Sequence, residues 1–353
     1  MGAGRVCHDF VQAGKLIPEQ AVFQAVGCRS LERSEEFAKT HGIPNVYGSY
    51  GEVAEDPEVE ICYVGMLHPY HCEWAKAALN AGKHVLPSTC SFQDTKELVE
   101  LAKAKGLFFM EGMWTRFFPA VEKATELINA GGVIGDIVAV HSDFGFNAQD
   151  VAEYPSHQMY DPKLGGGALL YLGPYPIAAC TLPFKGHKPV TVAATGVWDD
   201  KAGVDMAAAI SVLYSIKDPV AGRTFNAVGS LTFNMLGESC EETTYVGTKG
   251  RIKILTPAHC PLAMEVTMKQ EGRGNVTSKR VEYPLPAETE EMEQAGGFHY
   301  PNSLGFHYEA LAVHRCIRAG LTYCPQYSPE ECVAVADMMQ HTRVQTQQGG
   351  LPN

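Results

Sequence analysis

Hydrophobic and polar residues alternate in two different ways along the chain, and the first way fills its N-terminal third. Short apolar runs are each followed by a longer stretch whose apolar positions recur at helical spacing. The predicted strands lie at 21–27, 61–65, 84–86 and 107–110, and the predicted helices at 31–41, 73–81 and 95–105. Because strands and helices alternate with short links, this part of the chain favours a parallel, doubly wound sheet.

The pattern changes after about Phe118. A predicted helix at 120–130 ends at Gly131-Gly132, and longer strand-like segments follow, separated by polar turns. The predicted strands lie at 137–144, 190–197, 207–214, 224–235 and 264–269, and the predicted helices at 165–180, 307–320 and 329–345. We therefore predict an α/β chain with two domains. Residues 1–118 form the doubly wound domain, and residues 119–353 form an α/β domain with an open, mostly antiparallel sheet.

Composition narrows the classes of function. The chain has 353 residues, of which 45% are hydrophobic and 19% charged, as in ordinary globular proteins. Its formal net charge of -12 argues against nucleic acids and anionic membranes as partners. No apolar run is long enough to insert into a membrane, and His8-Asp9 interrupts any secretory signal.

Cysteine and histidine usage adds two expectations. The 11 cysteines are odd in number and form no CxxC pair, which indicates reduced thiols and a cytoplasmic location. His68 and His71 are three residues apart, as metal ligands can be. No Cys or Asp cluster supports them, so we predict no metal site.

The first residues resemble the glycine-rich turn that holds a dinucleotide pyrophosphate at the start of a helix. Two of the three usual glycines are present, and Cys7 stands at the third position. We expect cofactor contacts from Gly2, Gly4, Arg5 and Val6.

The residues after the next predicted strand indicate which dinucleotide is preferred. Binding of NAD usually calls for an acidic residue at this strand end, to hold the ribose hydroxyls. Here the strand runs into Arg29-Ser30, with Arg33 one helical turn further on. Because an arginine suits a 2′-phosphate, these residues favour NADP over NAD.

A strand normally precedes the glycine turn, but only Met1 stands before it here. This missing first strand would be central in a doubly wound sheet, so its loss would leave two inner strand edges with unpaired backbone groups. We expect one of three outcomes. The flanking strands close up, another chain donates a strand, or the N-terminal domain is loosened.

Five motifs occur in order along the chain and together resemble the Gfo/Idh/MocA oxidoreductase family. They are Gly2-Ala3-Gly4-Arg5, Tyr47-Gly48-Ser49-Tyr50, His68-Pro69-Tyr70-His71, the run from Glu111 to Pro119, and the run from Gly165 to Leu170. The Trp-Thr-Arg-Phe-Phe-Pro segment is similar to the branch of dimeric dihydrodiol dehydrogenases, also described as NADP-dependent D-xylose dehydrogenases.

The resemblance implies a Rossmann-like N-terminal domain and a C-terminal domain whose open sheet forms a homodimer. It implies hydride transfer between a nicotinamide and a sugar or diol carbon, with a general acid or base that moves the hydroxyl proton. His68 and Pro69 match a loop on the nicotinamide side of the cofactor. The positions that match the substrate pocket of the family are Trp114, Arg116, Phe117 and Phe144. Ordinary core packing between domains is the alternative for the three aromatic residues.

Two departures fall where the resemblance places the chemistry. The family has a Glu-Lys-Pro tripeptide after the strand that ends near Leu86, and Thr89 stands here in place of its lysine. A hydroxyl cannot supply the positive charge that lowers the pKa of a neighbouring acid. Tyr171 replaces the family aspartate, while Tyr175 matches the proposed proton donor. Four residues apart on one helix, Tyr171 and Tyr175 would share a face.

Three hypotheses follow. The leading one is a degenerate dehydrogenase that serves as a binding or structural component, as a homodimer or within a larger assembly, with NADP binding weakened or lost. The second is an active NADP-dependent oxidoreductase with an altered site, in which Tyr175 acts as the acid. The third is a small-molecule or nucleotide sensor that keeps Arg29 and Ser30 without turnover.

Overall fold

The computed structural model describes residues 1–129, 133–218, 222–272 and 274–349, and the chain divides into two compact units. Unit 1 comprises Met1–Phe117 and Leu285–Cys332, and unit 2 comprises Phe118–Pro284 and Val333–Asn353. Residues 285–332, which the sequence division placed in the second domain, belong to unit 1. Packing explains this, since the Phe306 ring lies 5.8 Å from the Phe10 ring and stacks on Trp114 at 4.3 Å.

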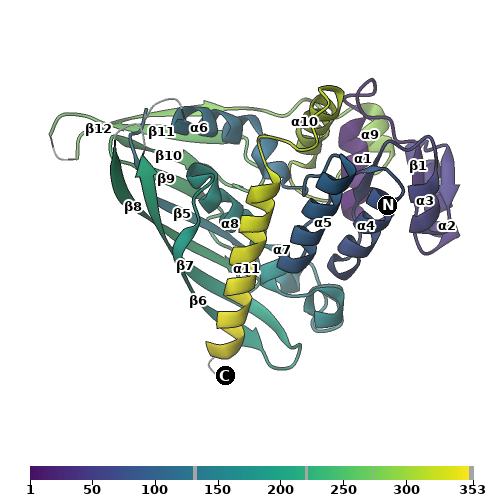
Figure 1. Ribbon diagram of the computed structural model, residues 1–353, viewed down its shortest axis with the longest axis horizontal. Coiled ribbons are helices and arrows are strands. Elements are labelled where there is room, and N and C mark those ends of the chain that lie inside the picture. The colour runs from purple at the N-terminus through teal and green to yellow at the C-terminus, as the bar shows by residue number, and fades with distance from the viewer. Residues whose placement is uncertain (130–132, 219–221, 273, 350–353) are drawn as a thin grey trace. The chain divides into compact units, whose positions relative to one another are not determined.

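Unit 1 alternates helices and strands, as the sequence predicted (Figure 1). Two of its helices begin after a serine cap and end at a glycine in the left-handed region; for example, Ser30 caps the first turn of one helix and Gly42 ends it. The helices are α1 (Arg5–Gly14), α2 (Leu31–His41), α3 (Tyr50–Glu55), α4 (His71–Asn80), α5 (Phe92–Lys105), α9 (Glu290–Gln294) and α10 (Phe306–Arg318). The strands are β1 (Ala25–Gly27), β2 (Asn45–Tyr47), β3 (Ile61–Val64) and β4 (His84–Pro87).

The strands of unit 1 form two separate parallel pairs, β1 with β2 and β3 with β4. Met1 and Gly2 lie between the pairs. The Gly2 N–H donates to the Gly27 carbonyl at 2.9 Å, and the Gly65 N–H donates to the Met1 carbonyl at 3.1 Å. Of the three expected outcomes, closure of the flanking strands does not occur, because these two residues keep β1 and β3 apart. The other two outcomes stay predictions.

Two predicted strands of unit 1 are shorter than expected. The apolar run 21–27 forms a strand only over its last three residues, in β1. The run 107–110 is no strand, although Phe109 makes an isolated parallel bridge with Val85.

Unit 2 is built on one mixed sheet of eight strands in the order β12-β11-β10-β9-β5-β8-β7-β6. All neighbours are antiparallel except β5 and β8. The strands are β5 (Ile137–Gly145), β6 (Pro189–Asp199), β7 (Val204–Asp218), β8 (Arg223–Asn234), β9 (Thr243–Gly247), β10 (Gly250–Ile254), β11 (Ala263–Lys269) and β12 (Val276–Glu282). The open, mostly antiparallel sheet predicted from the sequence is thereby confirmed.

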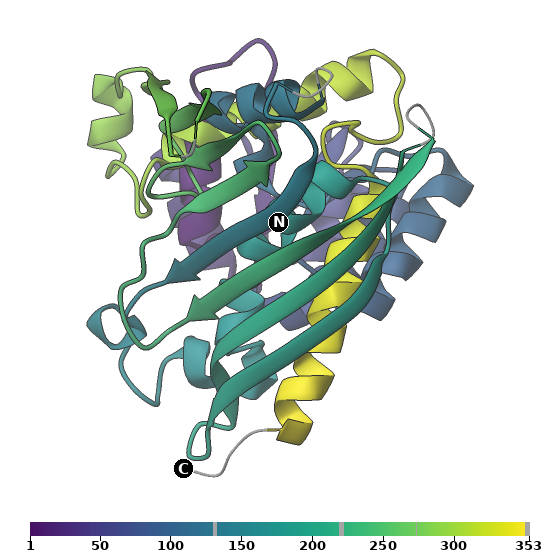
Figure 2. The same cartoon turned by 90° about the vertical axis from the view of Figure 1, so that its left-hand side faces the viewer.

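One face of this sheet is covered by helices, and the other is open. The covering helices are α6 (Pro119–Asn129), α7 (Ala168–Tyr171), α8 (Pro174–Thr181) and α11 (Pro329–Gly349). Residues of β8 alternate accordingly, with Leu231 and Phe233 buried and Ser230 and Thr232 exposed. In Figure 2 no helix of the described part of unit 2 lies over the face turned to the viewer.

The helix predicted at 165–180 is interrupted. Helix α7 ends at Tyr171, Leu172 leaves the helical region with φ of -121°, and α8 begins at Pro174. Proline lacks an N–H and clashes with the preceding turn, so a new helix starts there. The prediction that Tyr171 and Tyr175 share one helix face is therefore wrong.

Two further features bear on the expectations from composition. All 11 cysteines are free thiols, and only Cys240 is exposed. Among the helices of the described residues, none combines the length and apolarity needed to cross a membrane.

Candidate functional site

The glycine turn in unit 1 has the backbone that a dinucleotide turn needs. Gly2 has φ of +116°, a region that side chains rarely adopt, and a Cβ there would lie 2.6 Å from the Gly65 carbonyl oxygen. The Cys7 thiol donates to the same oxygen at 3.0 Å. Only glycine fits at position 2, and a small residue such as Cys7 suffices at the third position.

The start of α1 is open. Its N-cap is Gly4, whose backbone is extended, and no side chain of the described residues caps this end. A Cβ at Gly4 would meet nothing within 4 Å, and Arg5 and Val6 are exposed. The first N–H groups of a helix carry partial positive charge, so this end can accept an anion such as a pyrophosphate.

The predicted 2′-phosphate residues gather at the end of β1. The Arg33 guanidinium donates to the Ala3 carbonyl of the glycine turn at 3.3 Å, and the Ser30 hydroxyl accepts the Arg33 N–H at 3.3 Å. The Arg29 guanidinium lies 5.5 Å from the centre of the Tyr70 ring. Two exposed guanidinium groups thus lie close to the glycine turn or to the His68-Pro69-Tyr70 loop.

Thr89 is buried, and its carbonyl contacts the imidazole of His71. His71 lies with Nδ1 at 2.9 Å from the Thr89 carbonyl and Nε2 at 2.7 Å from the Met66 carbonyl. Burial lowers the pKa of neighbouring His68 to about 3, so this ring is neutral at ordinary pH. His71 therefore joins the loops after β3 and β4. His68 adds no positive charge there at ordinary pH.

Two buried carboxyl groups near the end of β4 were missed by sequence reasoning. Glu111 accepts the Thr95 hydroxyl at 2.7 Å and the Cys90 N–H at 3.3 Å, and burial raises its pKa to about 7. Glu309 on α10 is 1% exposed, and burial raises its pKa to about 8. Glu111 stands in a family motif, but nothing in the sequence pattern joins Glu309 to it.

Two of the three aromatic residues predicted to line a pocket, Trp114 and Phe117, are buried within unit 1. Trp114 stacks on Phe306, and Phe117 is fully buried. The Arg116 guanidinium lies 3.1 Å from a Glu331 carboxylate oxygen and 5.3 Å from the centre of the Tyr327 ring. These contacts are those of core packing, and contact with a substrate stays a prediction for these residues.

Unit 2 brings Tyr175 together with one predicted and one unpredicted residue. Tyr175 lies in the first turn of α8, and its ring is edge-on to that of Phe144 on β5 at 5.3 Å. His259, in the loop between β10 and β11, stacks on Phe144 at 4.3 Å and lies 5.6 Å from the Tyr175 ring. The chain offers no local signal for His259, because the contact joins residues far apart in sequence.

Helix α7, which carries Tyr171, is fixed from the sheet. Gly167 has φ of +112°, and the Leu169 N–H donates to the Asp205 carboxylate of β7 at 2.6 Å. Burial raises the pKa of Asp205 to about 6. Asp205 thus takes the part of a capping residue for α7, which has no cap of its own.

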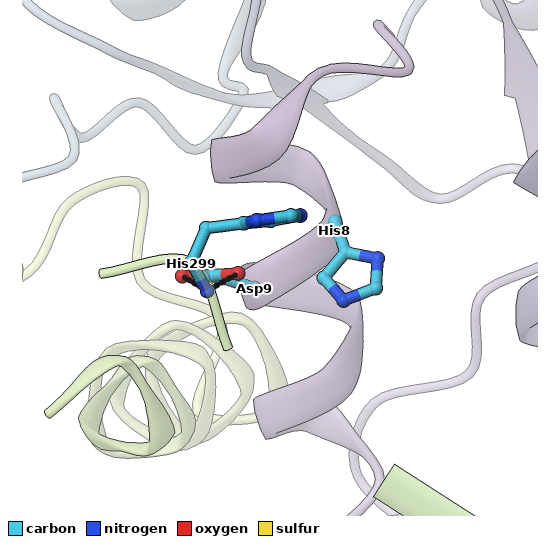
Figure 3. Close-up of side chains that lie close together, drawn as sticks. All are labelled: His8, Asp9 and His299. Carbon is cyan, nitrogen blue, oxygen red and sulfur yellow. Dashed lines mark hydrogen bonds between the residues drawn. The ribbon is translucent and has the colours of Figure 1, made fainter. Parts of the chain in front are cut away.

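Among the described residues one group of side chains, His8, Asp9 and His299, could hold a metal ion by proximity (Figure 3). The side chains of Asp9 and His8 already have partners. The Asp9 carboxylate accepts the His299 and Tyr300 N–H groups at 3.0 Å each, and the His8 ring faces the Gly297 carbonyl at 3.0 Å. The group therefore clamps the 297–300 segment onto α1.

Comparison with known proteins places this geometry in a family. A model described as an oxidoreductase family with an NAD-binding Rossmann fold matches residues 1–113, and a GFO/IDH/MocA C-terminal domain matches residues 121–253. The chain belongs to the Gfo/Idh/MocA oxidoreductase family. The resemblance drawn from the five motifs is confirmed, as is a Rossmann-type domain followed by an open-sheet domain.

Relatives in this family are similar over nearly the whole chain. Trans-1,2-dihydrobenzene-1,2-diol dehydrogenases of Danio rerio, Sus scrofa and Homo sapiens are 34%, 35% and 32% identical, each over 97% of this chain and 94% of its own length. A levoglucosan dehydrogenase solved with NADH and L-sorbose has a TM-score of 0.81 at 18% identity, covering 99% of this chain and 96% of its own. KijD10, a 3-ketoreductase from Actinomadura kijaniata solved with NADP and TDP-benzene, has a TM-score of 0.75 at 21% identity, covering 98% and 96%.

Proposed function

We propose that this protein is an NADP-dependent oxidoreductase that transfers hydride between NADP and a hydroxyl-bearing carbon of a sugar or a trans-dihydrodiol. The observation that carries the proposal is the turn at Gly2, whose positive φ and contact with Gly65 leave the start of α1 open toward an anion. The similarity to dihydrodiol dehydrogenases supports the class of substrate.

The residues divide the work between binding and proton transfer. When bound, a nicotinamide supplies the hydride acceptor or donor. The pyrophosphate would be held by Gly2, Gly4, Arg5 and Val6, and the 2′-phosphate by Arg29, Ser30 and Arg33. In unit 2 the Tyr175 phenol oxygen gives the proton to a carbonyl, or takes it from a hydroxyl, as the hydride moves.

A titration with NADPH and NADH followed by fluorescence tests the cofactor half of the proposal. The double variant Arg29→Ala with Arg33→Ala should weaken NADPH binding by about 10- to 100-fold, the loss of charge-assisted bonds to a phosphate, and leave NADH unchanged. Arg318→Ala, which removes an arginine paired with Glu60, is the matched control. Equal losses for both nucleotides would refute the 2′-phosphate assignment.

Turnover of D-xylose and of a trans-dihydrodiol tests the catalytic half. The second candidate, a protein that binds NADP without catalysis, is favoured by Thr89 and Tyr171 at the family lysine and aspartate positions. If it is right, the wild type binds NADPH without turnover, and Thr89→Lys with Tyr171→Asp together should recover some activity. The lysine would stand next to Cys90, whose N–H donates to the Glu111 carboxylate.

The open face of the unit 2 sheet supports a homodimer as the assembly. Val197 on β6 and Val228 on β8 lie on this face and are 45% and 46% exposed. Val228→Arg should shift a dimer toward monomer in light scattering, whereas Val344→Arg on α11 should not. A monomeric wild type would refute a homodimer, and association with other proteins would then point to a larger assembly. The free thiols support a cytoplasmic location.

A further inference from the structure

Three rings from different elements of unit 2 pack against one another. His259 and Phe144 are nearly parallel, with an interplanar angle of 12° and centroids 4.3 Å apart. The Tyr175 ring stands across both, at 78° to Phe144 and 67° to His259. The stacked pair thus forms a flat wall against which the ring of the candidate proton donor is set.

The His259 ring has a polar neighbour near each nitrogen. Its Nδ1 lies 3.4 Å from a Glu241 carboxylate oxygen, and its Nε2 lies 3.3 Å from the Cys260 sulfur. The histidine and glutamate side chains are 12% and 15% exposed, and Cys260 is fully buried. A protonated ring would form a largely desolvated ion pair with Glu241, which is stronger than a pair on the surface.

Glu241 adopts a backbone conformation that costs free energy. Its φ is +49°, and such values for residues other than glycine persist only where the surroundings enforce them. The Asp143 carboxylate of β5 accepts the Glu241 N–H at 2.8 Å, and the Ala258 N–H donates to the Glu241 carbonyl at 2.8 Å. Both bonds tie Glu241 to the strand of Phe144 and the loop of His259, so the strained residue is aimed at the imidazole.

We propose that His259, anchored by Glu241, is a positioning residue for Tyr175: it fixes the ring of the proton donor and, when protonated, gives it a neighbouring positive charge. The inference rests on the proposed function, since it assigns a partner to the same tyrosine. A cation beside a phenol stabilises the phenolate, which is the state Tyr175 must enter each time it gives up a proton.

The charges around the imidazole allow this role. Glu241 faces it from the loop before β9, Cys260 from its own loop, and Phe144 and Tyr175 from β5 and α8. The Asp143 carboxylate is turned to the Glu241 and Glu242 N–H groups, and the Glu242 carboxylate pairs with Lys253 at 2.7 Å. Glu241 is thus the carboxylate that contacts the ring, on the side of Nδ1.

The test is the exchange His259→Phe, which keeps an aromatic ring for the stack and removes the charge and the ion pair. We expect kcat for D-xylose or dihydrodiol oxidation to fall about tenfold with KM for NADP unchanged. Glu241→Gln should lower kcat in the same direction. His141→Phe, the same exchange at an exposed position of β5, is the matched control.

A second readout does not depend on turnover. With 13C-labelled tyrosine, the Tyr175 resonance is identified by its loss in Tyr175→Phe, and at neutral pH it should shift in His259→Phe and stay in place in His141→Phe. A wild-type kcat in His259→Phe would overturn the inference. If the wild type binds NADPH but never turns over, the proposed function fails; an unmoved Tyr175 resonance then overturns the inference too, and a shifted resonance supports it.

Discussion

The glycine turn of unit 1 and the Tyr175 cluster of unit 2 were reached in opposite ways. In unit 1 the residues that matter are neighbours in sequence, from Gly2 to Val6, and one backbone contact with Gly65 completes the turn. In unit 2 Tyr175 contacts residues from β5 and from the loop after β10. A local sequence motif thus predicts a binding turn. The residues of a proton-transfer site that come from several strands and loops of a sheet cannot be predicted from local patterns.

The comparison is tested most severely by Gly2→Val. A Cβ at this position lies 2.6 Å from the Gly65 oxygen and φ is +116°, so the turn must open and β1 must move relative to β3. We expect NADPH affinity to fall by more than about 100-fold, because the first N–H groups of α1 would no longer point toward the pyrophosphate. Fluorescence titration measures this. Gly42→Ala is the control, since its φ of +71° carries strain but its Cβ would meet nothing within 4 Å. Unchanged affinity in Gly2→Val would remove the turn from the cofactor site.

The corresponding exchange in unit 2 is Tyr175→Phe. It keeps the ring beside Phe144 and His259 and removes the hydroxyl that carries the proton. We expect kcat to fall by about 100-fold or more with cofactor affinity unchanged, the usual contribution of a general acid. Tyr171→Phe serves as the control, because Tyr171 belongs to a separate helix and has no assigned proton. A larger loss in Tyr171→Phe than in Tyr175→Phe would move the catalytic assignment to α7.

These two cases mark how far the sequence reaches. Period and turn residues predicted the two-part α/β fold and most elements, because each depends on neighbours within one helix or strand. Strand β12 was missed because almost all of its side chains are exposed, which removes the alternation that identifies a strand. The break between α7 and α8 falls at Pro174, inside the segment predicted as one helix at 165–180.

The missed site residues share a different cause. His259 and Glu241 are ordinary polar residues in loops, and only the pairing of β9, β10 and β5 brings them to Tyr175. Glu309 lies on α10 in a segment that was placed in the other domain, so its place in unit 1 with Glu111 was not considered. Burial, which gives these groups their properties, is a result of the fold and has no local sequence signature.

Glu309→Gln tests how a buried carboxyl group that has no assigned role in catalysis affects the stability of unit 1. Its pKa is raised to about 8 from 4.5, so the folded state holds a proton that the unfolded state releases as pH rises from 4.5 to 8. Stability supported by this proton is present at low pH and lost toward pH 8. The difference corresponds to at most about 5 kcal/mol, and part of it should return as a gain in Glu309→Gln at pH 8.5.

Urea unfolding at pH 5 and pH 8.5 measures that gain. Glu293→Gln, at an exposed position of α9, is the matched control and should change neither curve. If Glu309→Gln is less stable than the wild type at both pH values, the carboxyl has a partner that makes it structural rather than costly.

The smallest effect is expected from His41, whose pH dependence has the opposite sign. Burial and the nearby His8 ring lower its pKa to about 4 from 6.5, and its Nε2 lies 3.1 Å from His8 Nδ1. The unfolded state therefore binds a proton between pH 6.5 and 4 that the folded state refuses. Its contribution to stability is complete above pH 6.5 and is lost as pH falls toward 4, by at most about 3 kcal/mol.

His41→Gln should flatten this part of the stability curve, while His341→Gln, at an exposed position of α11, should leave it intact. Urea unfolding between pH 4 and pH 7 separates the two. A wild-type slope in His41→Gln would mean that acid lability of unit 1 arises elsewhere, with the buried ring of His68 as the next group to exchange. Since His8 follows the glycine turn on α1, a slope carried by His41 would tie the acid stability of unit 1 to the helix that starts the cofactor site.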